Sequence, residues 1–168
     1  GQVLSDAPLA LARNTFEQTL DREYGGFGSA PKFPHPTTLD RLLRHWRCTA
    51  NDTEPDVEAL FMVALTLARM AEGGLFDHIG GGFYRYSVDR SWQIPHFEKM
   101  LYDNGPLLAI YAQAAVATGD ALFDYAANAT ADWMLADMRD ANGGFYATRD
   151  ADSEGHEGLF YLWDPDEV

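Results

Sequence analysis

The sequence predicts an all-α protein of antiparallel helical hairpins, with small β-hairpins in the long connections at one end. Three observations predict this fold class. Apolar residues recur every three or four positions in five stretches, which is the period of an amphipathic helix. The triplet Gly-Gly-Phe begins at residues 25, 81 and 143, each time just after an odd-numbered helix. Long connections follow the odd-numbered helices and short ones the even-numbered helices, which places the long connections at one end.

The first two helices each show a single apolar stripe. Ser5 or Asp6 is predicted to cap the first helix, which ends before Gly25-Gly26. The second helix is predicted to follow Pro36, with Thr37 as its cap. The residues expected to share one face are Leu9, Ala12, Phe16 and Leu20 in the first helix and Leu39, Leu42, Leu43 and Trp46 in the second.

A third helix is predicted from about Pro55 to Glu72, and Gly73-Gly74 supplies its C-terminal stop. Its apolar stripe consists of Val57, Leu60, Phe61, Ala64, Leu65 and Ala68, and Met62, Val63 and Leu67 extend the stripe around the cylinder. Because so much of its surface is apolar, we expect this helix to be covered on more than one side.

The fourth helix is predicted to begin near Asp103 or Asn104 and to reach Thr118, because Pro106 suits a first turn and is costly in a helix interior. Residues 97–102 are then a separate turn, or they join the helix through a kink. Asp120 is predicted to cap a fifth helix. Its apolar face is expected to comprise Phe123, Ala126, Ala127, Thr130, Trp133, Met134 and Met138, before Asn142-Gly143 ends it.

Two of the long connections are predicted to contain a β-hairpin. Aromatic and β-branched residues flank polar turns, so we expect residues 83–86 to pair with 92–94 and residues 145–147 to pair with 159–162. At the end of the sequence, Asp164 followed by Pro165 has the pattern of another helix start. We therefore expect the sequence to be a single domain, residues 1–168, cut from a longer polypeptide.

Composition excludes several classes of partner. The 168 residues include 12 basic and 26 acidic side chains, which leaves a formal net charge of −14. Such a charge repels nucleic acid phosphates and anionic membrane surfaces, so neither is an expected partner. With 46% hydrophobic and 13% aromatic residues, the chain can bury a sizeable core.

Cysteine content and the first residues suggest a location. Cys48 is the single cysteine, so an internal disulfide and a metal site built on several cysteines are excluded. The first residues lack a basic region followed by an apolar core, and no apolar run is long enough to span a membrane. We therefore expect a soluble, cytoplasmic protein.

The stretch from Gly80 to Asn104 is the strongest candidate for a functional site. It combines glycines, aromatic residues and the sequence His96-Phe97-Glu98-Lys99, followed by Asp103. A histidine beside carboxylates can transfer protons near neutral pH, so His96, Glu98 and Asp103 are candidate catalytic residues. The alternative is that His96 and Glu98 hydrogen-bond the loop backbone and hold the hairpin to the helix.

A second acidic group follows the third Gly-Gly-Phe. Asp150, Asp152 and Glu154 resemble the start of a calcium-binding loop, but the twelfth position is Tyr161 instead of glutamate. We favour carboxylates that accept sugar hydroxyls or act as acid and base, and an Asx-turn cluster is the alternative. The histidines show no metal-binding spacing, and no phosphate-binding glycine loop is present, so no metal and no cofactor are predicted.

Aromatic and basic residues in the same connections suggest a binding surface. Flat rings with polar edges suit stacking against sugar faces, although core packing is the alternative for each ring. The candidate substrate-binding residues are Tyr84, Arg85, Tyr86, Trp92, Phe145 and Arg149. We expect His96 and Glu98 to point toward Asp150 and Asp152 of the next connection.

Three long motifs support a resemblance to a known family. The segments GGFGSAPKFP (25–34), FDHIGGGFYRYSVDRSWQIPHFEKMLYDN (76–104) and GGFYATRDADSEGHEGLFYLW (143–163) resemble signature segments of the thioredoxin-domain-containing family that includes spermatogenesis-associated protein 20. The resemblance covers nearly the whole chain. Members of that family carry a thioredoxin-like domain followed by an (α/α)6 toroid similar to N-acylglucosamine 2-epimerase and the six-hairpin glycosidases.

The resemblance implies a half-toroid and a sugar-like ligand. The chain matches only the first half of the toroid and lacks both the thioredoxin-like segment and a C-x-x-C motif. The implied function is a carbohydrate-active domain of epimerase or glycosidase type, and the alternative is a non-catalytic binding or scaffold module. Half a toroid would expose apolar helix faces, so we expect self-association and no activity from this segment alone.

Overall fold

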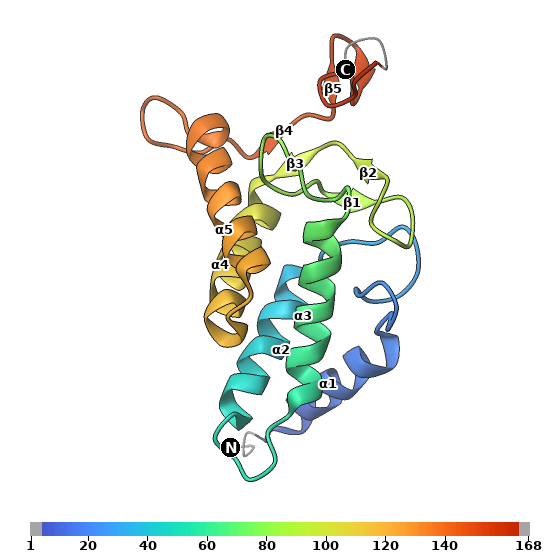
Figure 1. Cartoon of the computed structure of the whole chain (residues 1–168), viewed down its shortest axis with the longest axis vertical. Coiled ribbons are helices and arrows are strands. Elements are labelled where there is room, and N and C mark those ends of the chain that lie inside the picture. Colours follow the sequence, from blue (N-terminus) through green and yellow to red (C-terminus); the bar gives the residue numbers. More distant parts are fainter. Residues whose placement is uncertain (1–4, 165–168) are drawn as a thin grey trace.

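Five α-helices in two layers form the body of the protein, in a computed structural model that describes residues 5–164 (Figure 1). The helices are α1 (Ala7–Thr19), α2 (Pro36–Thr49), α3 (Val57–Glu72), α4 (Leu101–Thr118) and α5 (Ala121–Trp133), and α5 continues as the π-helical turn η1 (Met134–Met138). The pairs α2–α3 and α4–α5 pack as hairpins, α2 contacts α4, and α3 contacts both α1 and α5. The predicted all-α fold of antiparallel hairpins is confirmed.

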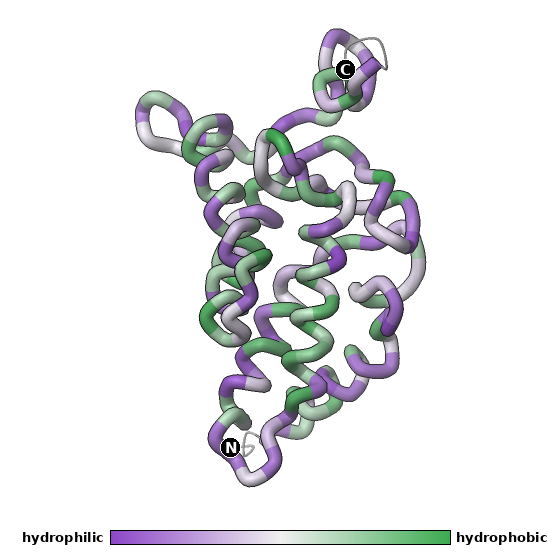
Figure 2. The backbone as a smooth tube through the Cα atoms, in the orientation of Figure 1, coloured by the Kyte–Doolittle hydropathy of each residue, from purple (hydrophilic) through white to green (hydrophobic). Residues whose placement is uncertain are grey.

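Helix α3 occupies the centre of the hydrophobic core. Its buried residues are Ala59, Met62, Val63, Thr66, Leu67, Met70 and Ala71, and apolar residues recur along it in Figure 2. The prediction that this helix is covered on more than one side holds, but the buried face is rotated from the expected stripe, because Val57 is 68% and Phe61 42% exposed. Helix α1 has no buried residue.

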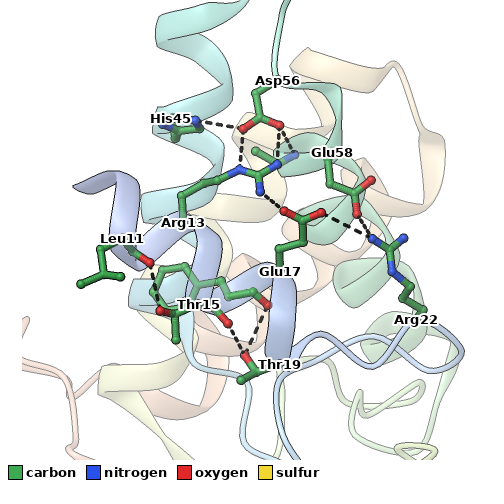
Figure 3. A network of polar contacts seen from close by, with 11 residues as sticks. Leu11, Arg13, Thr15, Glu17, Thr19, Arg22, His45, Asp56 and Glu58 are labelled. Atoms are coloured by element: carbon green, nitrogen blue, oxygen red, sulfur yellow. Dashed lines mark hydrogen bonds and ion pairs between the residues drawn. The ribbon is translucent and has the colours of Figure 1, made fainter. Parts of the chain in front are cut away.

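Ion pairs attach α1 to the α2–α3 hairpin (Figure 3). The Nε and Nη2 atoms of Arg13 donate to the carboxylate of Asp56 at 2.6 and 2.9 Å. The same carboxylate lies 3.0 Å from Nε2 of His45 and accepts a hydrogen bond from the backbone of Ala59, which caps α3. The partly buried carboxylate of Asp56 therefore joins α1, α2 and α3.

The ends of two helices differ from prediction. Pro36 is the first residue of α2, so the cap position belongs to His35, with φ of 46°, and not to Thr37. Helix α4 begins at Leu101, directly after a strand, and Pro106 lies inside it. The side chain of Asn104 donates to the carbonyl oxygens of Phe83 and Met100 and ties the first turn of α4 to the preceding connection. These tertiary bonds hold a helix start that proline by itself disfavours.

The short strands are β1 (Tyr86–Ser87), β2 (Pro95–His96), β3 (Lys99–Met100), β4 (Thr148–Arg149), β5 (Asp152–Ser153) and β6 (His156–Glu157). Strands β1 to β4 lie together above the helix ends in Figure 1, and β5 lies farther up, in the C-terminal segment. All three pairs, β1–β2, β3–β4 and β5–β6, are antiparallel.

The first predicted hairpin is present with a different register. Residues 86–87 pair with 95–96 because the Asp89 side chain accepts the backbone N–H groups of Gln93 and Ile94 and lengthens the loop. The second predicted pairing, 145–147 with 159–162, is wrong. Strand β4 pairs with β3 of the previous connection, and β5 pairs with β6 across Glu154 and Gly155. Both turn residues have positive φ, as a tight two-residue hairpin requires.

The three Gly-Gly-Phe segments form one type of loop. Each loop begins with an aspartate, which is Asp21, Asp77 or Asp140. Its backbone N–H donates to the carbonyl of the second glycine, and its backbone carbonyl accepts from the N–H of the first glycine. The first glycine has φ of 67°, 83° and 91° in the three loops, a region that glycine occupies without strain. The sequence repeat is therefore a structural repeat.

The chain has two lysines, and each fills one of these loops. The Nζ atom of Lys32 lies 2.6 Å from Oδ2 of Asp21 and 2.7 Å from the carbonyl oxygen of Gly25. Lys99 repeats the arrangement with Asp77 and Gly81 at 2.7 and 2.8 Å. Because each ammonium group is at most 1% exposed, these are buried ion pairs.

Within residues 5–164, no helix has the length and apolar character needed to cross a membrane. The predicted helix start at Asp164-Pro165 extends beyond the described residues.

Candidate functional site

The second connection brings four of the predicted catalytic and binding residues together. Strands β1–β3 lead into the first turn of α4, so Arg85, His96, Glu98 and Asp103 lie in one group. Glu157 joins the group from strand β6 of the third connection. We call these five residues the His96 cluster.

The imidazole of His96 is held from two sides. Its ring stacks on Tyr86, with centroids 4.8 Å apart and an interplanar angle of 17°. Its Nδ1 lies 2.6 Å from a carboxylate oxygen of Glu157, and its Nε2 lies 3.8 Å from Oε2 of Glu98. In the neutral ring, donation from Nδ1 to Glu157 leaves the lone pair on Nε2, which is the form of a proton acceptor.

Glu98 is oriented by a cation and a hydroxyl group. Nη1 of Arg85 donates to Oε2 of Glu98 at 2.8 Å, and the hydroxyl of Thr148 reaches Oε1 at 3.4 Å. The side chain of Glu98 is 20% exposed, so it remains accessible from solvent. The Nε atom of Arg85 is buried and has no partner among the described residues. A bound oxygen atom would satisfy this donor.

Asp103 is the carboxylic acid in the cluster with the most perturbed pKa. Burial of the carboxyl group, opposed by the charge of Arg85 and aided by that of Glu98, raises the pKa of Asp103 to about 6. Asp103 is 8% exposed. A carboxyl group with this pKa exchanges its proton near neutral pH, which suits a general acid or base.

The third connection divides its acidic residues between the His96 cluster and a cavity. Asp150 and Asp152 line this cavity of about 390 Å³, together with Asp137, Arg149, Ala151, Ser153, Phe160 and Tyr161. Glu157 contacts His96, and Asp152 is the cross-strand partner of Glu157 in the β5–β6 pair. The carboxylate of Asp150 accepts the backbone N–H of Asp152, the Asx-turn alternative. Glu154 is exposed on the β5–β6 turn.

The predicted aromatic residues separate into buried and accessible rings. Trp92 is 0% and Tyr84 4% exposed, and the indole Nε1 of Trp92 donates to the carbonyl of Tyr24. These two rings therefore support the connections from within the core. Tyr86 remains partly accessible, and Phe33, which is 39% exposed, stacks on it at 4.9 Å. Phe145 is 45% exposed on the third Gly-Gly-Phe loop.

Two residues near the predicted ones have no local signal in the sequence, Glu157 in the His96 cluster and Asp137 in the cavity of Asp150 and Asp152. Glu157 lies far from His96 in the chain and becomes its partner only because the β5–β6 hairpin packs over Phe97. That packing consists of Tyr161, stacked on Phe97 at 5.6 Å, and Gly158, which contacts the same ring. Asp137, on η1, lines the same cavity as Asp150 and Asp152. Among residues 5–164, no group of three or more His, Cys, Asp or Glu side chains could hold a metal ion.

Comparison with known proteins gives relatives by sequence. The chain is 43% identical over 158 residues to spermatogenesis-associated protein 20 of Rattus norvegicus and 41% identical over 158 residues to that of Homo sapiens. An uncharacterized protein of Caenorhabditis elegans is 40% identical over 161 residues. Each alignment covers 90% of this chain, which spans about a fifth of the length of these relatives, 20 to 22%. No family model matches the chain.

Comparison of structures gives the fold. The cellobiose 2-epimerase of Spirochaeta thermophila matches with a TM-score of 0.68 and 21% identity, over 84% of this chain and 38% of that one. The cellobiose 2-epimerase of Bacillus thermoamylovorans matches with a TM-score of 0.65 and 14% identity, over 87% and 42%. A sugar epimerase from a ruminal bacterium matches with a TM-score of 0.64 and 16% identity, over 85% and 40%.

The order of helices, the repeated loops and the two comparisons agree on one assignment. The chain is homologous to one segment of spermatogenesis-associated protein 20, and that segment has the fold of part of an epimerase-like (α/α)6 toroid.

Proposed function

We propose that the His96 cluster binds a sugar-like ligand and moves protons to and from it, in a reaction of epimerase or glycosidase type. The single observation that carries the proposal is the convergence of an imidazole and two carboxyl groups with different surroundings. His96 contacts Glu157 through Nδ1, which leaves Nε2 available. Glu98 is paired with Arg85, and the pKa of Asp103 is raised to about 6. Groups in contrasting environments divide acid and base roles.

Each residue has a distinct role in this proposal. For epimerisation beside a carbonyl group, one base removes the proton from carbon and an acid returns a proton to the opposite face. His96 Nε2 is the base, Asp103 is the acid near neutral pH, and Arg85 holds the oxygen that gains negative charge. In the hydrolytic version, Glu98 and Asp103 divide the acid and base roles across the scissile bond.

An accessible aromatic ring supports the choice of ligand. Tyr86 is stacked on both His96 and Phe33, and Phe33, which is 39% exposed, offers a ring surface beside the cluster that suits the apolar face of a sugar. The titles of the structural neighbours name cellobiose 2-epimerases and a sugar epimerase, which adds weight to a sugar as ligand. Their identity to this chain is low, so the proposal depends on the cluster and not on the fold.

The test follows proton exchange on the ligand. The longest available polypeptide that contains this segment is incubated with reducing mono- and disaccharides in D₂O, and deuterium at the sugar carbons is followed by NMR. Epimerase action predicts deuterium incorporation with the epimer as product, and glycosidase action predicts release of the monosaccharide. In His96→Ala either rate should fall by about 10²-fold or more. The rate in Asp103→Asn should fall by a comparable factor.

The matched control is Gln93→Ala, on the exposed part of the same hairpin. It should leave the rate unchanged. Equal rates in His96→Ala and wild type would reject the assignment. Saturable sugar binding with no exchange or hydrolysis under any condition would favour the alternative, a non-catalytic binding module.

A further inference from the structure

The segment from His96 to Lys99 presents alternate side chains to two environments. His96 and Glu98 belong to the His96 cluster, with Nε2 of His96 3.8 Å from Oε2 of Glu98. Phe97 and Lys99 instead contact the ring of Tyr161, since the Phe97 ring stacks on it at 5.6 Å and the Lys99 ammonium lies 5.1 Å from its centroid. In an extended chain, successive side chains point to opposite sides. One side of this segment therefore carries the proposed reacting groups, and the other side holds the third connection.

The ring of Tyr161 is enclosed by residues of the second connection. In addition to Phe97 and Lys99, Tyr84 meets it edge-on, with centroids 5.1 Å apart and an interplanar angle of 85°. Tyr84 belongs to the hydrophobic core, and Tyr161 packs against that core. Edge-on and stacked rings are the favoured geometries of aromatic pairs, and a cation over the ring faces adds to them. The neighbouring Phe160 is 77% exposed, so Tyr161 is the ring that anchors this segment.

A tight turn joins the anchor to Glu157. The backbone N–H of Tyr161 donates to the carbonyl oxygen of Gly158 at 2.8 Å. Gly158 has φ of 75°, and a Cβ atom added to it would lie 2.5 Å from Cδ2 of Phe97, so the chain passes directly over that ring. Glu157 directly precedes Gly158, and Phe97 directly follows His96. The contact of the turn with Phe97 therefore sets where Glu157 lies relative to His96.

Glu157 depends on this anchor because its own side chain is 52% exposed. Its carboxylate lies 2.6 Å from Nδ1 of His96, and a polar contact at such an exposed position competes with water and gains little by itself. A carboxylate that packing elsewhere already holds in place loses less freedom when it accepts the hydrogen bond. The seat of Tyr161 thus supports a bond that Glu157 alone would hold only weakly.

We propose that Tyr161 and Glu157 are positioning residues that fix the tautomer of His96. Tyr161 anchors the turn on Phe97, Glu157 accepts a hydrogen bond from Nδ1, and the lone pair of the neutral ring stays on Nε2. The hydrogen bond at one ring nitrogen determines which nitrogen carries the proton. The consequence for catalysis rests on the proposed function, in which Nε2 is the base, whereas the tautomer itself can be measured without a sugar.

The first measurement is NMR of the histidine ring nitrogens, whose chemical shifts differ between the two neutral tautomers. The signals of His96 are identified by their loss in His96→Gln, and spectra are recorded without ligand at a pH where the ring is neutral. In the wild-type protein the proton should be on Nδ1. Glu157→Ala and Tyr161→Leu should both shift the ring toward protonation at Nε2, the first by removing the acceptor and the second by releasing the turn that carries it.

Two matched variants separate the anchor from a general loss of structure. Tyr161→Phe should keep the wild-type tautomer, because the contacts that hold Tyr161 are made by its ring. Phe160→Leu removes an exposed ring next to the anchor and should also keep it. Because Glu157 lies at the surface, Glu157→Ala should fold as wild type does, so the tautomer is tested even where Tyr161→Leu loses local structure.

Turnover gives a second readout. In the polypeptide used for the activity test, Glu157→Ala and Tyr161→Leu should lower kcat about 10-fold or more with little change in KM, since neither residue has a role in holding the sugar. A wild-type ring protonated at Nε2, or a Tyr161→Leu ring with wild-type nitrogen shifts, would overturn this proposal. The expected spectra in a protein without turnover would instead reject the proposed reaction and support the positioning of His96.

Discussion

The second and third connections begin with nearly the same sequence and end in different environments. Residues 77–84 and 140–146 both form the aspartate–glycine–glycine loop with the same backbone hydrogen bonds. In the second connection the loop is covered by α5 and filled by Lys99. In the third, no atom of residues 5–164 lies within 4 Å of a Cβ added to either glycine, and the phenylalanine is 45% exposed. Local sequence therefore determines the turn, and the neighbouring helix determines its burial.

Burial in the second connection surrounds the ammonium group of Lys99 with aromatic rings. It is surrounded by the rings of Tyr84, Trp133 and Tyr161 at 4.9, 4.8 and 5.1 Å, in addition to its bonds to Asp77 and Gly81. Cation–π contacts of this kind strengthen when water is excluded. The equivalent aspartate of the third loop, Asp140, instead accepts a hydrogen bond from the exposed Tyr146.

The largest expected loss of stability follows replacement of the lysine in the second loop. Lys99→Met leaves the carboxylate of Asp77 buried without its cation, which should lower the free energy of unfolding by about 3–5 kcal/mol. Lys32→Met should cost less in the first loop, because Arg90 also donates to both carboxylate oxygens of Asp21, at 2.7 and 2.8 Å. Urea denaturation followed by circular dichroism measures both. A loss below about 1 kcal/mol would show that the ion pairs do not hold these loops.

The next comparison replaces the first glycine of two loops. Gly81→Ala and Gly143→Ala both introduce a side chain at positive φ, at a cost of about 1–2 kcal/mol. Gly81→Ala also forces a Cβ against the carbonyl of Ala129, which should add about 1–3 kcal/mol. The same denaturation experiment should therefore separate the two variants. Equal losses would mean that the covering helix moves away freely.

A pH-dependent effect of intermediate size is expected at Asp103. Its folded pKa, about 6, lies above the ordinary value of 3.8, so the folded state holds the proton more tightly between these pH values. Stability contributed by the protonated carboxyl is present at low pH and is lost as the pH rises through about 6. Asp103→Asn should then raise the free energy of unfolding by about 1–3 kcal/mol at neutral pH, with little change near pH 4.

Urea titrations at several pH values test this prediction. Gln93→Ala serves as the neutral control on the same connection. If the effect of Asp103→Asn on the free energy of unfolding is the same at all pH values, the pKa of Asp103 is not raised in the folded state and the proposed acid role fails.

The smallest effect is expected at Asp140, with the opposite dependence on pH. The backbone N–H of Asn142 and the hydroxyl of Tyr146 lower the pKa of Asp140. The contribution of such a carboxylate is present above its unfolded pKa and is lost as the pH falls through its folded pKa. Asp140→Asn should therefore slightly lower the thermal midpoint at neutral pH and leave it unchanged in acid. A loss as large as that of Lys99→Met would contradict the contrast between the two loops.

Much of the fold was predictable because its signals are local. Helix periods, the cap at Asp120 and the repeated Gly-Gly-Phe each depend on residues close in sequence. The errors have tertiary causes. Asn104 anchors an early start of α4 despite Pro106, and β4 pairs with β3 from the previous connection, a partner that no local pattern indicates.

The candidate site divides in the same way. His96, Glu98 and Asp103 lie within one short stretch, so the sequence placed them together. Glu157 reaches His96 only through the packing of a distant hairpin, and Asp150 and Asp152 line a separate cavity. Trp92 was predicted as a binding residue but lies in the core, where it packs against Gly26 and donates to the carbonyl of Tyr24 from the first connection.

The helices, the three glycine loops and the residues of the second connection could be predicted from the sequence, since each follows from backbone preferences and short-range periodicity. The covering of two loops by helices, the burial of both lysines and the contact of Glu157 with His96 follow only from the packing of the whole chain. Burial and long-range partners depend on how separate helices pack, and those contacts set the pKa of Asp103 and the open surface of the third loop.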